Sequence, residues 1–158
     1  MGLFSRRAKK EDPRARAVNP PDEQDARARA VNMLEETAAE FWPKVPATFP
    51  DGTPFPARPA YDEIVALGRA LAFSPHPDAA DLMMYCFKTL AGFAEVANPE
   101  TFLASNAVEA ADARGLLLEA GMVQEERALS RGLLLILDYH EKAGHELVMD
   151  IDAEGNRV

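Results

Sequence analysis

Histidine and carboxylate side chains near the carboxyl end are the first candidates for chemistry. The string His140-Glu141-Lys-Ala-Gly144-His145 is superficially like the zinc-binding HExxH motif. Its histidines are five residues apart, about 140° around a helix, whereas the motif needs a spacing of four so that both rings share one face. Gly144 is also expected to end the helix before His145. The pattern therefore favours a surface helix end over a metal site.

Scattered residues offer a second kind of site. His76, Tyr85, Asp138 and His140 are the groups from which an enzyme, a small-ligand site or a metal site without a recognisable motif would be built. One alternative function of this chain is therefore that of an enzyme or of a small-ligand-binding or metal-binding protein, with a site near His76, Asp138 and His140.

Cys86 is the only cysteine, which excludes an intramolecular disulfide and a paired-cysteine metal or redox site. It lies between Tyr85 and Phe87, whereas a reactive thiol needs an electropositive, partly exposed position. We expect Cys86 to pack as a small apolar side chain. The sequence has no phosphate-binding loop, dinucleotide-binding motif or nucleophile elbow. No catalytic residue, cofactor or metal ligand is assigned, and the sequence favours a protein that is not an enzyme.

Charge is divided unevenly along the chain. Residues 1–30 contain eight Lys/Arg and five Asp/Glu, a net charge of +3. Residues 31–158 contain nine Lys/Arg and 21 Asp/Glu, a net charge of −12. An acidic body repels phosphate backbones, so we expect no direct nucleic-acid binding by it. A regular row of carboxylates would instead imitate nucleic acid, which is the second alternative function.

The first 21 residues are expected to form a disordered basic tail that contains prolines. Leu3 and Phe4 beside four cations would give only a weak contact with an anionic membrane surface. No apolar run reaches the roughly 20 residues that span a bilayer. We therefore expect a cytoplasmic protein, with residues 22–158 as a single helical domain.

Apolar residues recur at helical spacing along the rest of the chain, and Pro or Gly separates the periodic segments. The predicted helices cover residues 22–42, 60–73, 77–97, 99–104, 106–120 and 122–143. The fold class is therefore all-α, a compact bundle of about five or six helices with a helical hairpin at 106–143. The helix over 77–97 is apolar on most sides and is expected to be the central one. Residues 146–152 favour a short strand or a docked extended tail equally.

Residues 43–59 contain six prolines and predict a long surface loop. Loops of this length are uncommon and often functional. Phe49 and Phe55 alternate with the prolines, Asp51 lies in a turn signature, and Trp42 precedes the loop. These four are the predicted interaction residues. Two interpretations stay open, a binding surface for another protein and a packed cover over the core.

The absence of catalytic motifs, the Pro-rich loop and the acidic body together favour a non-catalytic protein-interaction domain. An adaptor, a chaperone-like protein or an inhibitor of the immunity type would fit this pattern. The partner is expected to be another protein. The apolar residues of the last two predicted helices suit a homodimer interface and a monomer core equally well.

Overall fold

The structure is a computed structural model that describes residues 21–97 and 104–145, with side chains described for 22–97 and 112–145. The chain divides into two compact units, residues 1–30 and 31–158, and each is described by itself. All but Pro21 of the predicted tail, the predicted strand at 146–152 and nearly all of the predicted helix at 99–104 lie outside the described residues.

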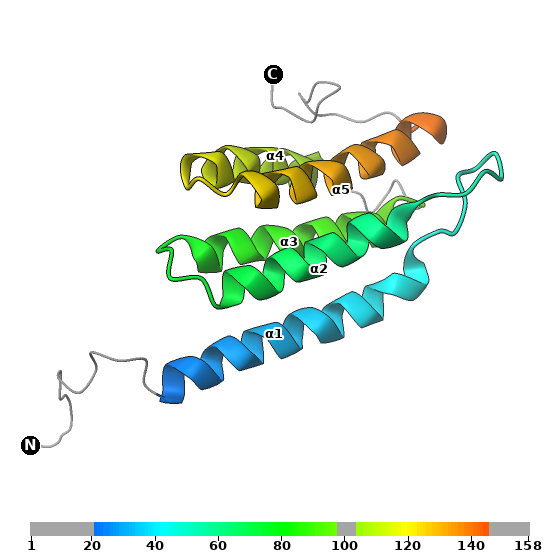
Figure 1. The fold of residues 1–158 in the computed structure, drawn as a ribbon. Coiled ribbons are helices and arrows are strands. Elements are labelled where there is room, and N and C mark those ends of the chain that lie inside the picture. Colours follow the sequence, from blue (N-terminus) through cyan, green and yellow to red (C-terminus); the bar gives the residue numbers. More distant parts are fainter. Residues whose placement is uncertain (1–20, 98–103, 146–158) are drawn as a thin grey trace, which may run out of the picture. The chain divides into compact units, whose positions relative to one another are not determined.

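The described residues are mostly helical and form no sheet (Figure 1). The elements are α1 (Pro21–Phe41), the short 3-10 helix η2 (Trp42–Lys44), α2 (Ala57–Ala72), α3 (Ala79–Glu95), α4 (Ala104–Glu119) and α5 (Val123–Lys142). The predicted all-α class is therefore confirmed. None of the described helices combines the length and the apolarity that crossing a bilayer requires.

Proline and charge set most helix ends. Within the first unit, α1 begins at Pro21, and Asp22 and Glu23 in its first turn favourably face the positive end of the helix dipole. The start of α2 differs from the prediction, because this helix begins at Ala57 and includes Pro59. Proline is tolerated there because N–H groups of a first turn have no partner inside the helix.

Helices α2 to α5 form a ring within the unit 31–158. Each packs against its neighbours in chain order, and α5 returns to pack against α2. Figure 1 shows that α2 and α4 run in one direction and α3 and α5 in the other. The predicted hairpin is present as α4 and α5, joined at Gly121, whose φ of 78° suits glycine. The interior of the ring holds large side chains from different helices: Tyr61, Ile64, Leu90, Phe93, Leu117, Leu129 and Leu133.

The α3 helix is not the central rod that the sequence predicts. Leu90, Phe93 and Cys86 are buried, but Met84 is 55% exposed. In a ring of four helices each helix keeps an outward face, so the apolar residues that α3 carries beyond its buried face remain partly open to solvent.

The second half of α1 packs on α2. Leu34 is fully buried, and a Cβ atom added to Gly68 would lie only 2.4 Å from Leu34 Cδ2, so glycine permits this approach. The Tyr61 hydroxyl donates a hydrogen bond to the Ala38 carbonyl at 2.5 Å. Burial raises the pKa of Tyr61 to about 12, so this hydroxyl stays protonated and remains a donor.

Candidate functional site

An open groove of about 770 Å³ lies between α5 and the beginning of α2. Three leucines on α5 belong to its apolar lining. Its lining residues are Pro56, Pro59, Ala60, Glu63, Arg131, Leu134, Leu135, Leu137, Asp138 and Glu141.

The run Leu133-Leu-Leu-Ile-Leu137 explains why the groove is apolar. Leu133 and Ile136 are buried, at the spacing that one helix face provides. Leu134, Leu135 and Leu137 lie outside that face and are only half-buried. The helix α5 thus carries more apolar surface than the interior of the ring covers.

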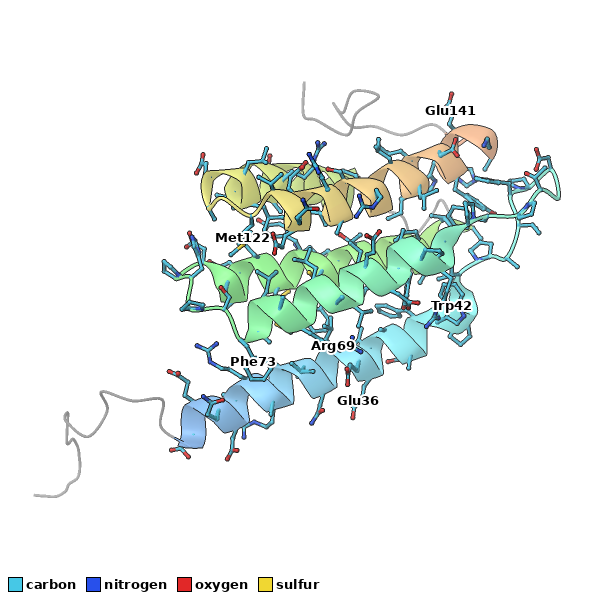
Figure 2. All side chains as sticks on the ribbon, viewed as in Figure 1. Glu36, Trp42, Arg69, Phe73, Met122 and Glu141 are labelled. Atoms are coloured by element: carbon cyan, nitrogen blue, oxygen red, sulfur yellow. The ribbon has the colours of Figure 1, made fainter. Side chains whose placement is uncertain are left out.

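Charged side chains border this apolar surface. Arg131 on α5 forms a two-point ion pair with Glu63 on α2, in which Arg131 Nε donates to Glu63 Oε1 at 2.8 Å. The hydrogen bond from Arg131 lowers the pKa of Glu63. Asp138 accepts a hydrogen bond from Lys142 at 3.1 Å. Glu141 is exposed and points away from the helices at the end of α5 (Figure 2). The lining thus contains three carboxylates, of which Glu63 pairs with Arg131 and Asp138 with the neighbouring Lys142, so Glu141 gives this rim its acidic excess.

The Pro-rich segment covers the end of the ring next to this groove. Phe49 and Phe55 are each only 5% exposed. The Phe49 ring stacks on Tyr139 with centroids 5.8 Å apart, and the Phe55 ring lies edge-on to Tyr139 at 5.1 Å. Phe55 also meets Phe93, at 6.3 Å between centroids. In this conformation the two phenylalanines belong to the packed interior.

The four predicted interaction residues do not form one surface. Phe49 and Phe55 face inward, whereas Asp51 lies at the exposed turn. The carboxylate of Asp51 accepts hydrogen bonds from Thr53 N and Oγ1 at 2.9 and 2.6 Å, which lower its pKa. Trp42 is half-buried, with the Arg58 guanidinium 4.3 Å from its ring centroid. Their role in binding stays a prediction.

The alternative site near His76, Asp138 and His140 is not assembled. His76 lies in the connection between α2 and α3, at the opposite end of the ring from the carboxyl end of α5 (Figure 1). There its Nδ1 accepts a hydrogen bond from Asp78 N at 3.1 Å. In the described ranges no group of three or more His, Cys, Asp or Glu residues could hold a metal ion.

The structure instead pairs His140 with His145, which the sequence interpretation missed. Gly144 adopts φ 75° after the last turn of α5 and reverses the chain. His145 N then donates to the His140 carbonyl at 2.9 Å, and Gly144 N donates to the Glu141 carbonyl at 3.1 Å. These are the two bonds of a Schellman motif, in which the residue after the glycine contacts the helix residue five positions earlier. The Nδ1 atoms of the two histidines lie 2.8 Å apart.

A buried ion pair fixes α4 against α5. Arg114 Nε donates to Glu126 Oε2 at 2.8 Å, and the Ser130 hydroxyl donates to the same oxygen at 2.6 Å. Burial raises the pKa of Glu126, but the hydrogen bonds from Ser130 and Arg114 outweigh it, so the net pKa is lowered. The charged form of Glu126 is therefore favoured in the folded protein.

Replacing Glu126 with glutamine is expected to lower the free energy of unfolding by about 1–3 kcal/mol, because Arg114 then loses its carboxylate partner in a poorly solvated position. Urea denaturation measures this change. Glu63→Gln is the control, because the ion pair of Glu63 with Arg131 is largely exposed and should cost at most about 1 kcal/mol. Equal losses for the two variants would contradict the assignment.

The only thiol of the chain should be inert in the folded state. Cys86 is buried, and burial raises its pKa to about 12, so its nucleophilic thiolate is scarce at neutral pH. We expect Ellman's reagent to label Cys86 only after denaturant is added, which the absorbance of the released thionitrobenzoate follows. Rapid stoichiometric labelling of the native protein would show that this segment opens to solvent.

Comparison of the chain with protein-family models, with curated proteins and with solved structures finds no match.

Proposed function

We propose that this chain is a non-catalytic protein-binding domain whose groove between α2 and α5 takes an amphipathic segment of another protein. The segment would place apolar side chains on Leu134, Leu135 and Leu137 and Lys or Arg side chains against the acidic rim. The observation that carries the proposal is the coincidence of half-buried leucines with an excess of carboxylates in one groove.

Apolar contact would supply most of the affinity. Burying apolar surface contributes about 25 cal/mol per Å², and a groove between two helices suits the apolar stripe of an amphipathic helix. The leucines at 134, 135 and 137 lie beside the buried face of α5, so a partner helix can cover them without any rearrangement of the interior.

Charge supports a basic partner. Of the carboxylates in the groove, Glu63 pairs with Arg131 and Asp138 with Lys142, which leaves Glu141 for a basic partner. Residues 31–158 also carry a net charge of −12. Such a field attracts basic segments over longer distances and repels acidic ones, which raises association rates more than final affinity. We expect binding to weaken as salt is added, because salt screens exposed charges.

The acidic-mimic alternative has less support. Two of the carboxylates in the groove, Glu63 and Asp138, already pair with Arg131 and Lys142. A surface that imitates nucleic acid needs unpaired negative charges in a row, and these pairs interrupt such a row in the groove.

Affinity capture of the tagged full chain from its native cells tests the proposal. We expect Leu135→Glu to remove the captured partner, because it places a charge on the apolar floor, and Glu141→Lys to reduce capture by reversing one rim charge. Leu118→Glu is the matched control, since Leu118 is 50% exposed on α4 outside the groove.

Circular dichroism of each variant shows whether it keeps its helices. Two outcomes would reject the groove as the binding site. One is equal capture of a partner by Leu135→Glu and Leu118→Glu, and the other is that the unchanged chain captures no protein that the Leu135→Glu variant does not also capture. If Leu135→Glu does not fold, Glu141→Lys decides the question, because its side chain is exposed.

A further inference from the structure

The paired histidines at the end of α5 are held by different means. The His140 side chain is 0% exposed and is packed in the interior. His145 is half-buried and is placed by the backbone bonds of the glycine turn. The ring centroids lie 5.0 Å apart and the planes cross at 53°. The turn thus brings the Nδ1 atom of His145, after the glycine, next to the Nδ1 atom of His140 in the last turn of α5.

We propose that His140 and His145 bind a divalent transition-metal ion, such as Zn²⁺ or Cu²⁺, through their two Nδ1 atoms. This inference is independent of the groove and of the proposed partner. Imidazole nitrogen is a preferred ligand of both ions.

Tautomer chemistry allows the exchange of a hydrogen bond for a metal ion. In this pair one Nδ1 carries a proton and donates a hydrogen bond to the other Nδ1, with 2.8 Å between the two atoms. Metal binding requires both Nδ1 lone pairs, so the ring that donates must carry its proton on Nε2 instead. The Nε2 atom of His140 is buried, whereas His145 is partly exposed, so we take His145 as the donor, whose proton reaches its own Nε2 through solvent. The proton stays on the His145 ring, and no net proton is released.

Metal binding requires the His145 ring to move. Zn–N bonds of about 2.0–2.1 Å in a tetrahedral site separate two nitrogens by about 3.3 Å, compared with 2.8 Å between the Nδ1 atoms. Because the ion must also lie on the lone-pair direction of each ring, the His145 ring has to turn as well as move away, and His145 is the partly exposed member of the pair. His140 keeps its packing throughout.

The electrostatic surroundings favour a cation at this point. The carboxyl end of a helix carries a partial negative charge, and His140 lies in the last turn of α5 with His145 just beyond it. Burial, and to a lesser degree the neighbouring His145, lower the pKa of His140 to about 4. The amine of Lys142 is engaged elsewhere, 4.1 Å from the Phe49 ring centroid and 3.1 Å from Asp138.

The coordination shell would be open. No set of three protein ligands exists among the residues that the structure describes, so water completes the shell. We therefore expect an affinity below that of sites with three protein ligands.

Titration of the chelator-treated, untagged full chain with Zn²⁺ alone tests the proposal. Isothermal titration calorimetry should detect one bound equivalent, and nitrogen-15 NMR of the imidazole rings should show Nδ1 coordination in His140 and His145. His145→Ala should abolish binding, whereas His76→Ala, at the other end of the ring, should bind as the unchanged chain does.

Two results would overturn the metal site. One is the absence of Zn²⁺ binding by the unchanged chain, and the other is equal binding by the unchanged chain and His145→Ala. Because Leu135 is not part of the pair, Leu135→Glu should bind Zn²⁺ normally even where it loses the protein partner, so the two proposals fail separately.

Discussion

Replacing Phe55 with alanine will lower the free energy of unfolding by about 3–5 kcal/mol, the usual cost of removing a fully packed aromatic ring. Phe55 is 5% exposed and contacts Phe49, Phe93 and Tyr139. Its removal leaves a cavity lined by three aromatic rings, and it detaches the Pro-rich segment from the end of the ring of helices. Aromatic pairs also contribute beyond their buried area, by about 0.5–1.5 kcal/mol each.

Phe73→Ala is the matched control for this loss. Phe73 lies at the carboxyl end of α2 and is 52% exposed (Figure 2). The same atoms are deleted, but little packing is lost, so the expected change is within about 1 kcal/mol. Urea denaturation followed by circular dichroism measures both variants. Equal changes would mean that the segment around Phe55 does not pack on the helices.

Replacing Gly132 with leucine will destabilise the protein by about 1–3 kcal/mol or more, through overpacking at the crossing of α2, α3 and α5. A Cβ atom at Gly132 would lie 3.4 Å from Ile64 on α2 and 3.4 Å from Phe93 on α3. That space accepts a methyl group in ordinary contact, but it has no room for the three further carbons of leucine. Gly132→Ala should therefore be tolerated.

Gly115 offers an internal control, because it occupies the same place in the repeated string Arg-Gly-Leu-Leu-Leu. A Cβ atom there meets nothing within 4 Å. Gly115→Leu should therefore stabilise α4 by about 0.5–1 kcal/mol, because leucine has the higher helix propensity. Thermal melting distinguishes the two sites by opposite shifts. A fall in melting temperature for Gly115→Leu as large as that for Gly132→Leu would contradict the open surroundings of Gly115.

The helices were predictable because their ends are marked by proline and glycine. Pro43 follows α1, Gly121 separates α4 from α5, and Gly144 follows α5. The start of α2 was less predictable, because Pro59 lies inside its first turn, where proline is compatible with both a loop and a helix.

How deeply α3 is buried could not be judged from its sequence. Met84 and Phe87 are apolar, but composition does not say how many neighbours a helix has. Four helices in a ring leave Met84 largely exposed. For the same reason the sequence suited a core position and an interface position equally for the leucines of α5. Only the packing of α2 against α5 shows which of these leucines are buried and which line the groove.

The histidine pair was missed because the spacing was measured along a helix alone. His140 and His145 are about 140° apart on a continuous helix, but Gly144 reverses the chain between them. The residue that follows a glycine cap commonly contacts the helix residue five positions earlier. Applied to Gly144, that rule would have predicted the contact.

Photo-crosslinking from Leu137 in the native cells tests the central claim most directly. A photoreactive amino acid at position 137 is predicted to crosslink to a segment of another protein that combines apolar residues with Lys or Arg, and the same group at Leu118 is not. Crosslinks to an acidic segment or to a second copy of this chain, or yields that are equal at both positions, would contradict a groove that binds a basic amphipathic partner.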